Sequence, residues 1–275
     1  MTGAADWQGR VGRTWAEEAE RTERAFAGIA TALDHAIADM APALGTALDI
    51  GCGVGSTALS LAAVRPDLSI VGADLSADLV AVAQARAIDR IRFVHDDALR
   101  VAADMAPLDL LVSRHGVMFF DDPVAAFTRL HAAVQPDAPL IFSCFGPRRE
   151  NDWARALDAV LDLDSNLISD APGPFAFAES GRVSAILDAA GWRRARVSDH
   201  EVPYVVGVGV DPIADALAFF RRIGPAASVL AAAPPDERGR IEDRLRDLLA
   251  ARTRDGAVAF TASIRIWHAV AGERA

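Results

Sequence analysis

The chain has 275 residues, 52% of them hydrophobic, which is enough for one large domain with a sizeable core. Its formal net charge of −10 argues against a nucleic-acid-binding protein, because contacts to phosphates need an excess of basic residues. All basic residues except histidine are arginine, so catalysis through a covalent lysine intermediate is excluded. The two cysteines provide no disulfide framework, and we expect neither a signal peptide nor a membrane-spanning run. These features predict a cytoplasmic protein.

Apolar residues recur at steps of three or four between residues 14 and 40, which predicts one amphipathic helix. A glycine-containing segment with Trp7 and Trp15 precedes it. We interpret this segment as a cover over a pocket; the alternative is a tryptophan that anchors the helix to the core. The predicted division is an N-terminal helical cover, residues 1–42, followed by a domain over residues 43–275.

Residues 46–57 form the sequence Thr-Ala-Leu-Asp-Ile-Gly-Cys-Gly-Val-Gly-Ser-Thr, which predicts a strand, a tight turn and the start of a helix. In open α/β sheets, nucleotide-like ligands bind at such a turn. A dinucleotide-binding loop needs a third glycine where Ser56 stands, and the chain has no Gly-Lys-Ser/Thr sequence for a P-loop. Instead an acid, Asp49, precedes the glycines.

This motif, Leu48 to Gly55, resembles the first motif of the class I S-adenosylmethionine-dependent methyltransferases. S-adenosylmethionine carries an ammonium and a sulfonium, so an acid beside the loop suits it better than a bare helix N-terminus does. The resemblance implies that this cofactor binds at the turn and that its product is S-adenosylhomocysteine. We expect the turn to contribute Asp49, Gly51, Cys52, Gly53, Gly55 and Thr57 to the cofactor site, with Trp15 contacting the cofactor from the cover.

Asp74 ends a predicted second strand over residues 69–74. In nucleotide-binding folds the acid that binds the ribose hydroxyls occupies this position, and a carboxylate can accept hydrogen bonds from both hydroxyls of a diol. The alternative role for Asp74 is a helix N-cap, which Ser76 fills better. We therefore predict that Asp74 binds ribose, with Leu75 beside it in the cofactor site.

Asp97 and Ala98 follow a predicted third strand over residues 91–95. The resemblance implies that this pair of an acid and a small residue holds the adenine, with Asp97 accepting from the adenine amino group. The alternative is that Asp97 only caps the next helix.

His115 follows the predicted fourth strand, residues 108–113, and is the candidate catalytic residue. We place Ser113 and Arg114 in the cofactor site. The run from Ser113 to Pro123 is similar to small-molecule methyltransferases related to the ubiquinone-biosynthesis type, in which phenylalanine is common at position 115. A histidine there has a near-neutral pKa that suits a general base, whereas the alternative is an aromatic ring that only packs.

The adjacent acids Asp121 and Asp122 do not predict a metal site, because Asp122 before a proline is typical of a helix N-cap. No metal is expected. Beyond residue 145, helical inserts are predicted at about residues 146–178 and 211–254.

The alternation of elements predicts the α/β class: a Rossmann-like doubly wound sheet of seven strands. The resemblance implies an antiparallel last strand. It also implies methyl transfer to an oxygen, nitrogen or carbon atom of a small-molecule acceptor, with neither nucleic acid nor membrane as a partner. A homodimer is the assembly we consider. Two alternatives stay open, a nicotinamide-dependent oxidoreductase and a non-catalytic S-adenosylmethionine-binding module.

Overall fold

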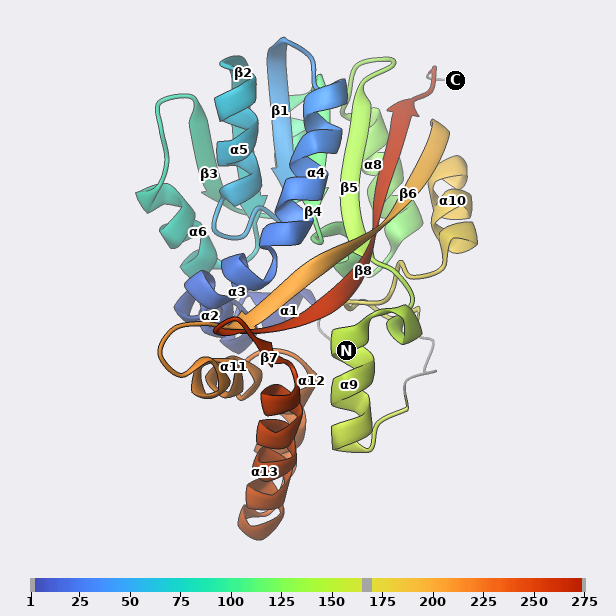
Figure 1. Cartoon of the computed structure of the whole chain (residues 1–275). Coiled ribbons are helices and arrows are strands. Elements are labelled where there is room, and N and C mark those ends of the chain that lie inside the picture. The colour runs from blue at the N-terminus through green and yellow to red at the C-terminus, as the bar shows by residue number, and fades with distance from the viewer. Residues whose placement is uncertain (1–2, 165–169, 274–275) are drawn as a thin grey trace.

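One twisted sheet forms the centre of the chain, whose computed structural model describes residues 3–164 and 170–273. The strand order is β3-β2-β1-β4-β5-β8-β6, and the two-residue β7 pairs with β8 (Figure 1). β1 to β5 are parallel, whereas β8 is antiparallel to both of its neighbours, β5 and β6. This arrangement confirms the predicted doubly wound sheet with an antiparallel last strand. The strands are β1 (Leu44–Ile50), β2 (Asp67–Asp74), β3 (Ile91–His95), β4 (Leu110–Arg114), β5 (Pro139–Phe145), β6 (Trp192–Gly207), β7 (Thr253–Arg254) and β8 (Ala257–Ala271).

Helices cover both faces of the sheet. α4 and α5 lie on one face, and α8 and α10 lie on the other (Figure 1). Because both faces are covered, the central strands β4 and β5 are buried almost throughout, as is usual for parallel strands. The α-helices are α1 (Ala4–Trp7), α2 (Arg10–Glu17), α3 (Ala19–Ala25), α4 (Ala27–Met40), α5 (Ser56–Val64), α6 (Ala77–Ala85), α7 (Ala98–Met105), α8 (Pro123–Ala132), α9 (Asp152–Leu161), α10 (Ser180–Ala189), α11 (Pro212–Phe220), α12 (Pro225–Ala232) and α13 (Pro235–Ala251), with 3₁₀ turns η1 (Val117–Phe119) and η2 (Arg148–Glu150).

Side-chain caps fix where several of these helices begin. The Ser76 hydroxyl accepts from the Leu79 N–H at 3.3 Å, and the Asp122 carboxylate accepts from the Ala125 N–H at 3.0 Å. Both predicted caps are therefore confirmed. Each cap satisfies a backbone donor that the first helical turn leaves without an intrahelical partner.

The predicted single helix over residues 14–40 is wrong. The chain instead forms α2, α3 and α4, which are separated by Glu18 and Phe26. The apolar period continues across both residues, so it gave no sign of the breaks. The residues at the two breaks make specific contacts. Glu18 forms ion pairs with Arg21 and Arg222, and Phe26 packs in the core.

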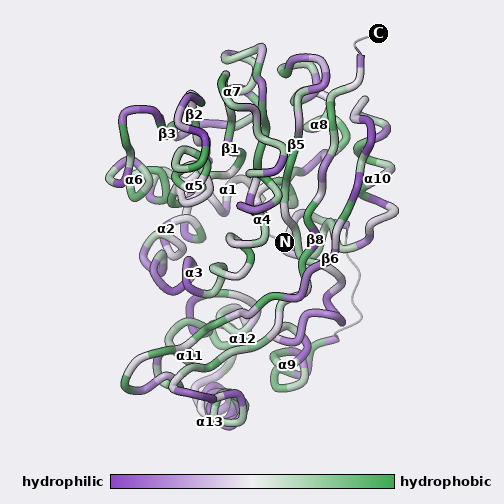
Figure 2. Tube along the Cα trace, turned by 45° about the horizontal axis from the view of Figure 1, so that its top comes forward, coloured by the Kyte–Doolittle hydropathy of each residue, from purple (hydrophilic) through white to green (hydrophobic). Residues whose placement is uncertain are grey.

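The second half of the chain adds helices below the sheet edge. α9 lies between β5 and the undescribed residues 165–169, and α11, α12 and α13 lie between β6 and β8. The predicted helical inserts at 146–178 and 211–254 coincide with these segments. Within the second insert, α12 was not predicted as a separate helix. Residues 165–169 of the first insert lie outside the described part of the chain. α13 carries mostly hydrophilic residues (Figure 2). Among the described helices, none has the length and hydropathy that a bilayer crossing needs. The domain division at residue 42 stays a prediction.

Candidate active site

A cavity of about 600 Å³ lies at the carboxyl ends of the parallel strands. This volume is within the range of small-molecule sites, and this edge of the sheet is where open α/β folds bind ligands. The loops after β1, β2, β3 and β4 form one part of its lining. Side chains of the N-terminal helices, β5, α8, α9, β6 and α11 form most of the rest.

The glycine loop after β1 is built from backbone conformations that favour glycine. Gly51, Gly53 and Gly55 have φ values of 65°, 54° and 84°. A Cβ on Gly55 would lie 2.4 Å from the ring of Phe93, so this glycine is needed for packing. A Cβ on Gly53 would meet nothing within 4 Å, which shows that the backbone here faces open space. A ligand can therefore lie directly against the loop at Gly53.

Asp74 connects the second strand to this loop. Its carboxylate accepts from the Gly53 N–H at 2.8 Å and from the Ser76 N–H at 2.9 Å, one bond to each oxygen. Burial raises the pKa of Asp74, and these two N–H groups oppose the rise. Because an ionised carboxylate can accept about four hydrogen bonds, Asp74 keeps acceptor capacity on the cavity side.

Four residues predicted for the cofactor site lie outside the cavity lining: Asp49, Gly55, Thr57 and Ser113. Asp49 and Thr57 are buried behind the loop. Asp49 sits inside the sheet, in register with Gly72 and Val112. Neither of its carboxylate oxygens has a hydrogen-bond partner among the described residues. Burial raises the pKa of Asp49 to about 7, although the charge of Arg114 opposes the rise. Direct contact of Asp49 with the cofactor stays a prediction.

Leu75, Asp97 and Ala98 line the cavity together at the ends of β2 and β3. The Asp97 carboxylate accepts from the Leu99 N–H at 2.9 Å, so Asp97 does cap the next helix. The same residue still borders the cavity, and its role toward adenine stays a prediction. Asp96, which was not singled out from the sequence, lines the cavity beside it and is paired with Arg100.

At the carboxyl end of β4, Ser113 is buried away from the cavity, whereas Arg114 and His115 line it. Ser113 is fully buried; its hydroxyl donates to the Ile50 carbonyl at 2.7 Å and accepts from the Gly116 N–H at 3.2 Å. It therefore fixes the glycine loop from behind. Arg114 lines the cavity and forms an ion pair with Glu23 of α3, a partner that the sequence pattern did not indicate.

His115 borders the cavity in a left-handed backbone conformation, with φ of 62°, and is 4% exposed. Its Nδ1 lies 2.8 Å from the hydroxyl of Ser143, and its Nε2 is buried without a partner among the described residues. Burial, with a contribution from the charge of Arg114, lowers the pKa of His115 to about 3. The imidazole is therefore neutral at pH 7.

Five rings in mutual contact form one side of the cavity, and we call them the aromatic wall: Phe26, His115, Phe145, Trp153 and Tyr204. The ring centroids of successive members are 5.6, 4.4, 5.4 and 5.3 Å apart, and Tyr204 returns to Phe26 at 6.0 Å. These spacings are typical of favourable aromatic pairs. The sequence pattern does not indicate the wall apart from His115, because its members come from four separate parts of the chain, near residues 26, 115, 145–153 and 204.

The N-terminal helices form a roof over the cavity. Trp7 and Trp15 both line it; their ring centroids are 5.4 Å apart, and Trp7 also packs edge-on against Phe119. Gly12 allows α2 to lie close to α6, since a Cβ there would be 2.2 Å from the Ser76 hydroxyl. Both tryptophans of the N-terminal segment thus line the cavity, and a separate covering unit over residues 1–42 stays a prediction.

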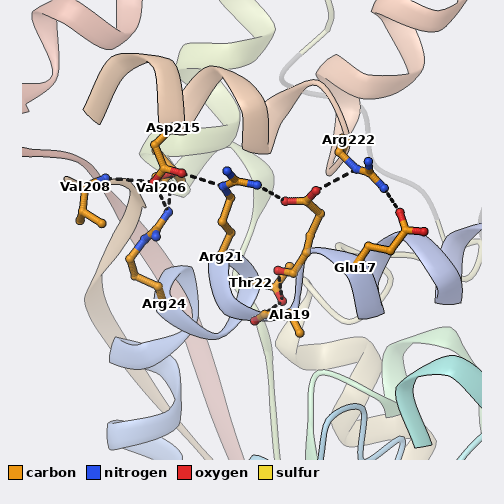
Figure 3. Close-up of polar contacts among 10 residues, drawn as sticks. Glu17, Ala19, Arg21, Thr22, Arg24, Val206, Val208, Asp215 and Arg222 are labelled. Carbon is orange, nitrogen blue, oxygen red and sulfur yellow. Dashed lines mark hydrogen bonds and ion pairs between the residues drawn. The ribbon is translucent and has the colours of Figure 1, made fainter. Parts of the chain in front are cut away.

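Charged side chains join this roof to α11, and we call them the roof network: Glu17, Glu18, Arg21, Arg24, Asp215 and Arg222 (Figure 3). Asp215 accepts from Arg21 and Arg24, at 2.7 Å each. Glu18, which is 5% exposed, pairs with Arg21 at 2.7 Å and with Arg222 at 2.8 Å. Ion pairs thus join the roof to α11 and to the turn that follows it.

Comparison with known proteins agrees with this geometry. A family model described as a methyltransferase domain matches residues 47–137, from β1 to the turn before β5. Trans-aconitate 2-methyltransferase of Azoarcus is 27% identical over 194 residues, covering 63% of this chain and 71% of that protein. Residues 47–137 form a methyltransferase domain of the class I S-adenosylmethionine-dependent type.

Other relatives of this methyltransferase agree in sequence or in fold. Demethylmenaquinone methyltransferase of Thermus thermophilus is 30% identical over 103 residues, 36% of this chain and 47% of that protein. The YcgJ protein of Bacillus has the same fold, with a TM-score of 0.56 and 16% identity, covering 89% of this chain and 99% of that one. A protein of Bacillus halodurans likewise has a TM-score of 0.56 and 13% identity, covering 88% and 98%. These findings do not favour the nicotinamide alternative.

S-adenosylmethionine is the cofactor of this methyltransferase, and the cavity fits it. The open space at Gly53 gives a ligand access to the loop backbone, and Asp74 has acceptor capacity for hydroxyl groups. Arg114 is already paired with Glu23, so the loop presents no free cation for a pyrophosphate. The similarity to the ubiquinone-biosynthesis group in particular stays a prediction.

Proposed function

We propose that this methyltransferase transfers the methyl group of S-adenosylmethionine to an oxygen, nitrogen or carbon atom of a small molecule held against the aromatic wall. One observation supports the proposal: most of the predicted cofactor residues, among them Gly53, Asp74 and Asp97, line the same cavity as the aromatic wall. They meet at His115 and Gly116, whose Cα would lie 3.0 Å from a Cβ on Gly51. A cofactor on the loop and an acceptor at the wall would therefore be neighbours.

The residues that would hold the cofactor are Gly53 and its loop, Asp74 for the ribose hydroxyls, and Leu75, Asp97 and Ala98 around the adenine. When bound, the cofactor supplies a methyl group already activated by its sulfonium. The chain therefore has to align the acceptor and exclude water rather than provide strong acid or base chemistry. Trp7, Trp15 and Phe119 support this role, because their rings close the roof over the cavity.

We propose that His115 does not act as a general base. A group with a pKa of about 3 holds a proton too weakly to compete for one on a hydroxyl or ammonium, whereas an effective base has a pKa near the working pH. Alignment in a dry cavity then accounts for catalysis. The sequence-based base hypothesis remains the alternative, and the His115→Phe variant described below distinguishes the two.

A small acceptor is supported by the size of the roofed cavity and by the relatives. Those relatives are named for trans-aconitate and for demethylmenaquinone, both small molecules. The net charge of −10 supports the absence of nucleic acid as a partner. A cytoplasmic location and a homodimer are parts of the proposal; light scattering of the purified chain at several concentrations tests the second.

Ligand-induced stabilisation tests the cofactor part of the proposal. S-adenosylhomocysteine at 100 times its dissociation constant should stabilise the fold by about 2.7 kcal/mol, while NADH and NADPH should not. Stabilisation by NADH or NADPH alone would contradict it. Once an acceptor is known, turnover separates an enzyme from a non-catalytic binding module: a chain that binds the cofactor without turnover would be such a module.

A further inference from the structure

Two polar atoms in the aromatic wall lack partners. The Nε2 of His115 is buried without a hydrogen bond to any described residue. The Tyr204 side chain is 4% exposed, and burial alone, with no hydrogen bond from a described residue, raises the pKa of its hydroxyl. The third polar group of the wall is satisfied, because Trp153 Nε1 donates to the Asn151 side chain at 3.1 Å. An unpaired buried polar group costs about 1–3 kcal/mol, so His115 Nε2 is a group that a ligand in the cavity would satisfy, and the Tyr204 hydroxyl of the same wall can bind beside it.

The proton on His115 can be placed by hydrogen-bond accounting. Ser143 is fully buried, and the only hydrogen bond of its hydroxyl to a described residue is the 2.8 Å contact with His115 Nδ1. If Nδ1 carried the proton, the Ser143 hydroxyl hydrogen would have no acceptor. Ser143 therefore donates to Nδ1, and the neutral imidazole carries its proton on Nε2. Both unpaired groups of the wall, Nε2–H and the Tyr204 O–H, are then hydrogen-bond donors.

The wall offers no free charge to a ligand. Arg114 is paired with Glu23, and Arg148, which lies over the neighbouring Phe175 ring, is paired with Asp158. Arg148 does not line the cavity, and the second arginine that does, Arg129, is an exposed residue of α8. A compound with several carboxylates would lose its hydration at the wall without gaining a cation there. Flat apolar rings, in contrast, pack well against Trp153 and Tyr204, which are themselves stacked at 5.3 Å.

We infer that the aromatic wall is the acceptor subsite and that it takes an uncharged ring compound whose oxygen accepts hydrogen bonds from His115 Nε2–H and the Tyr204 hydroxyl. This inference rests on the proposed function. It differs from the polycarboxylate named for the Azoarcus relative, which the wall does not suit. His115 and Tyr204 act in it as binding residues that orient the ring.

Four phenyl compounds of nearly equal shape test the inference: acetophenone, α-methylstyrene, benzoate and benzamidine. Their binding to the full chain is measured by titration in the presence of saturating S-adenosylhomocysteine. Acetophenone has a carbonyl oxygen where α-methylstyrene has a carbon, and we expect it to bind at least threefold to tenfold more tightly. Benzoate and benzamidine, which carry opposite charges, should bind more weakly than acetophenone.

Variants then connect the preference to the two donors. Tyr204→Phe and His115→Phe should each reduce the ratio of acetophenone to α-methylstyrene affinity by about threefold or more. Trp153→Phe is the control: it removes ring area but no donor to the ligand, so it should weaken both compounds and leave their ratio unchanged. S-adenosylhomocysteine affinity, measured on each variant, confirms that the fold is intact.

Several results would overturn the inference: equal affinity for acetophenone and α-methylstyrene, tightest binding of benzoate or benzamidine, no binding of any of the four, or a ratio that neither variant changes. These outcomes are distinct from failure of the proposed function, which would appear as loss of S-adenosylhomocysteine binding by the unmodified chain. The proton assignment has its own readout. The ¹⁵N NMR shifts of His115 should show the Nε2–H tautomer, and the Nδ1–H tautomer would contradict the two-donor arrangement.

Discussion

Replacement of Asp74 by alanine should weaken cofactor binding more than any other single change at the acidic side of the cavity. The Asp74 carboxylate accepts from the Gly53 and Ser76 N–H groups and keeps capacity toward the cavity. Each hydrogen bond to a charged group contributes about 1.5–3 kcal/mol, so one lost bond to ribose corresponds to a roughly 10-fold to 150-fold weaker affinity. We expect a low-micromolar dissociation constant in the unmodified chain. The released Gly53 N–H would add to the loss, because it helps to fix the loop.

Isothermal titration with S-adenosylhomocysteine is the assay, and Asp96→Asn is the matched control. Asp96 lines the same part of the cavity, but its carboxylate is paired with Arg100 on the surface. Asp96→Asn should therefore bind the ligand within about twofold of the unmodified chain. Thermal unfolding without ligand verifies that each variant is folded. Unchanged affinity in Asp74→Ala, or an equal loss in both variants, would refute the assignment of Asp74 to the ribose.

Three further predictions concern the roof, a buried acid and the histidine. Asp215→Ala removes the ion pairs with Arg21 and Arg24, which together stabilise the roof by about 1–2 kcal/mol after screening, so hydrogen exchange over residues 10–25 should become roughly fivefold to thirtyfold faster. Unchanged exchange would contradict this role of Asp215. Burial raises the pKa of Asp49 from 3.8 to about 7, so the free energy of unfolding decreases as the pH rises between these values. Asp49→Asn should remove this decrease, and equal pH slopes of the unfolding free energy in both proteins would contradict the assignment. His115→Phe should retain cofactor affinity and most of kcat while raising the acceptor KM, whereas a loss of about 10²–10⁴-fold in single-turnover rate would restore the base hypothesis.

The free energy of unfolding should also decrease at low pH, because Asp215 of the roof network becomes protonated there. Burial would raise the pKa of Asp215, but the hydrogen bonds from Arg21 and the Val208 N–H, with the charge of Arg24, lower it below 3.8 overall. The stabilisation from this group is therefore present above the unfolded pKa and is lost as the pH falls through the lower folded value.

The sheet and the glycine loop could be predicted because their signals are local. The strand before Gly51, the positive φ values of the glycines and the acid ending β2 are all encoded in neighbouring residues. The parallel direction of β1 to β5 follows from the same alternation, since parallel strands need helical crossovers, whereas the strand order was not predicted. The position of the Asp49 side chain could not be predicted in this way. Its place in the motif predicted a ligand contact, whereas in the structure it is buried within β1, outside the cavity lining.

The aromatic wall could not be predicted, because its rings meet only in three dimensions. Phe26 occupies a break between α3 and α4, Trp153 lies on α9 and Tyr204 lies near the end of β6. Nothing in the spacing of these residues brings them together. The roof network is similar: Glu18 and Asp215 belong to acidic positions that look solvent-exposed in sequence, and their partners become visible only when α11 packs beside α3.

Transfer of an isotopic methyl label tests the central claim most directly. The purified chain is incubated with S-adenosylmethionine bearing a trideuterated methyl group and an extract of the source cells, and the products are separated by mass spectrometry. The account predicts at least one small molecule labelled with a trideuterated methyl group in the sample with the unmodified chain and its loss in the Asp74→Ala sample. Label found only in proteins or nucleic acids, or no label despite measured S-adenosylhomocysteine binding, would contradict it.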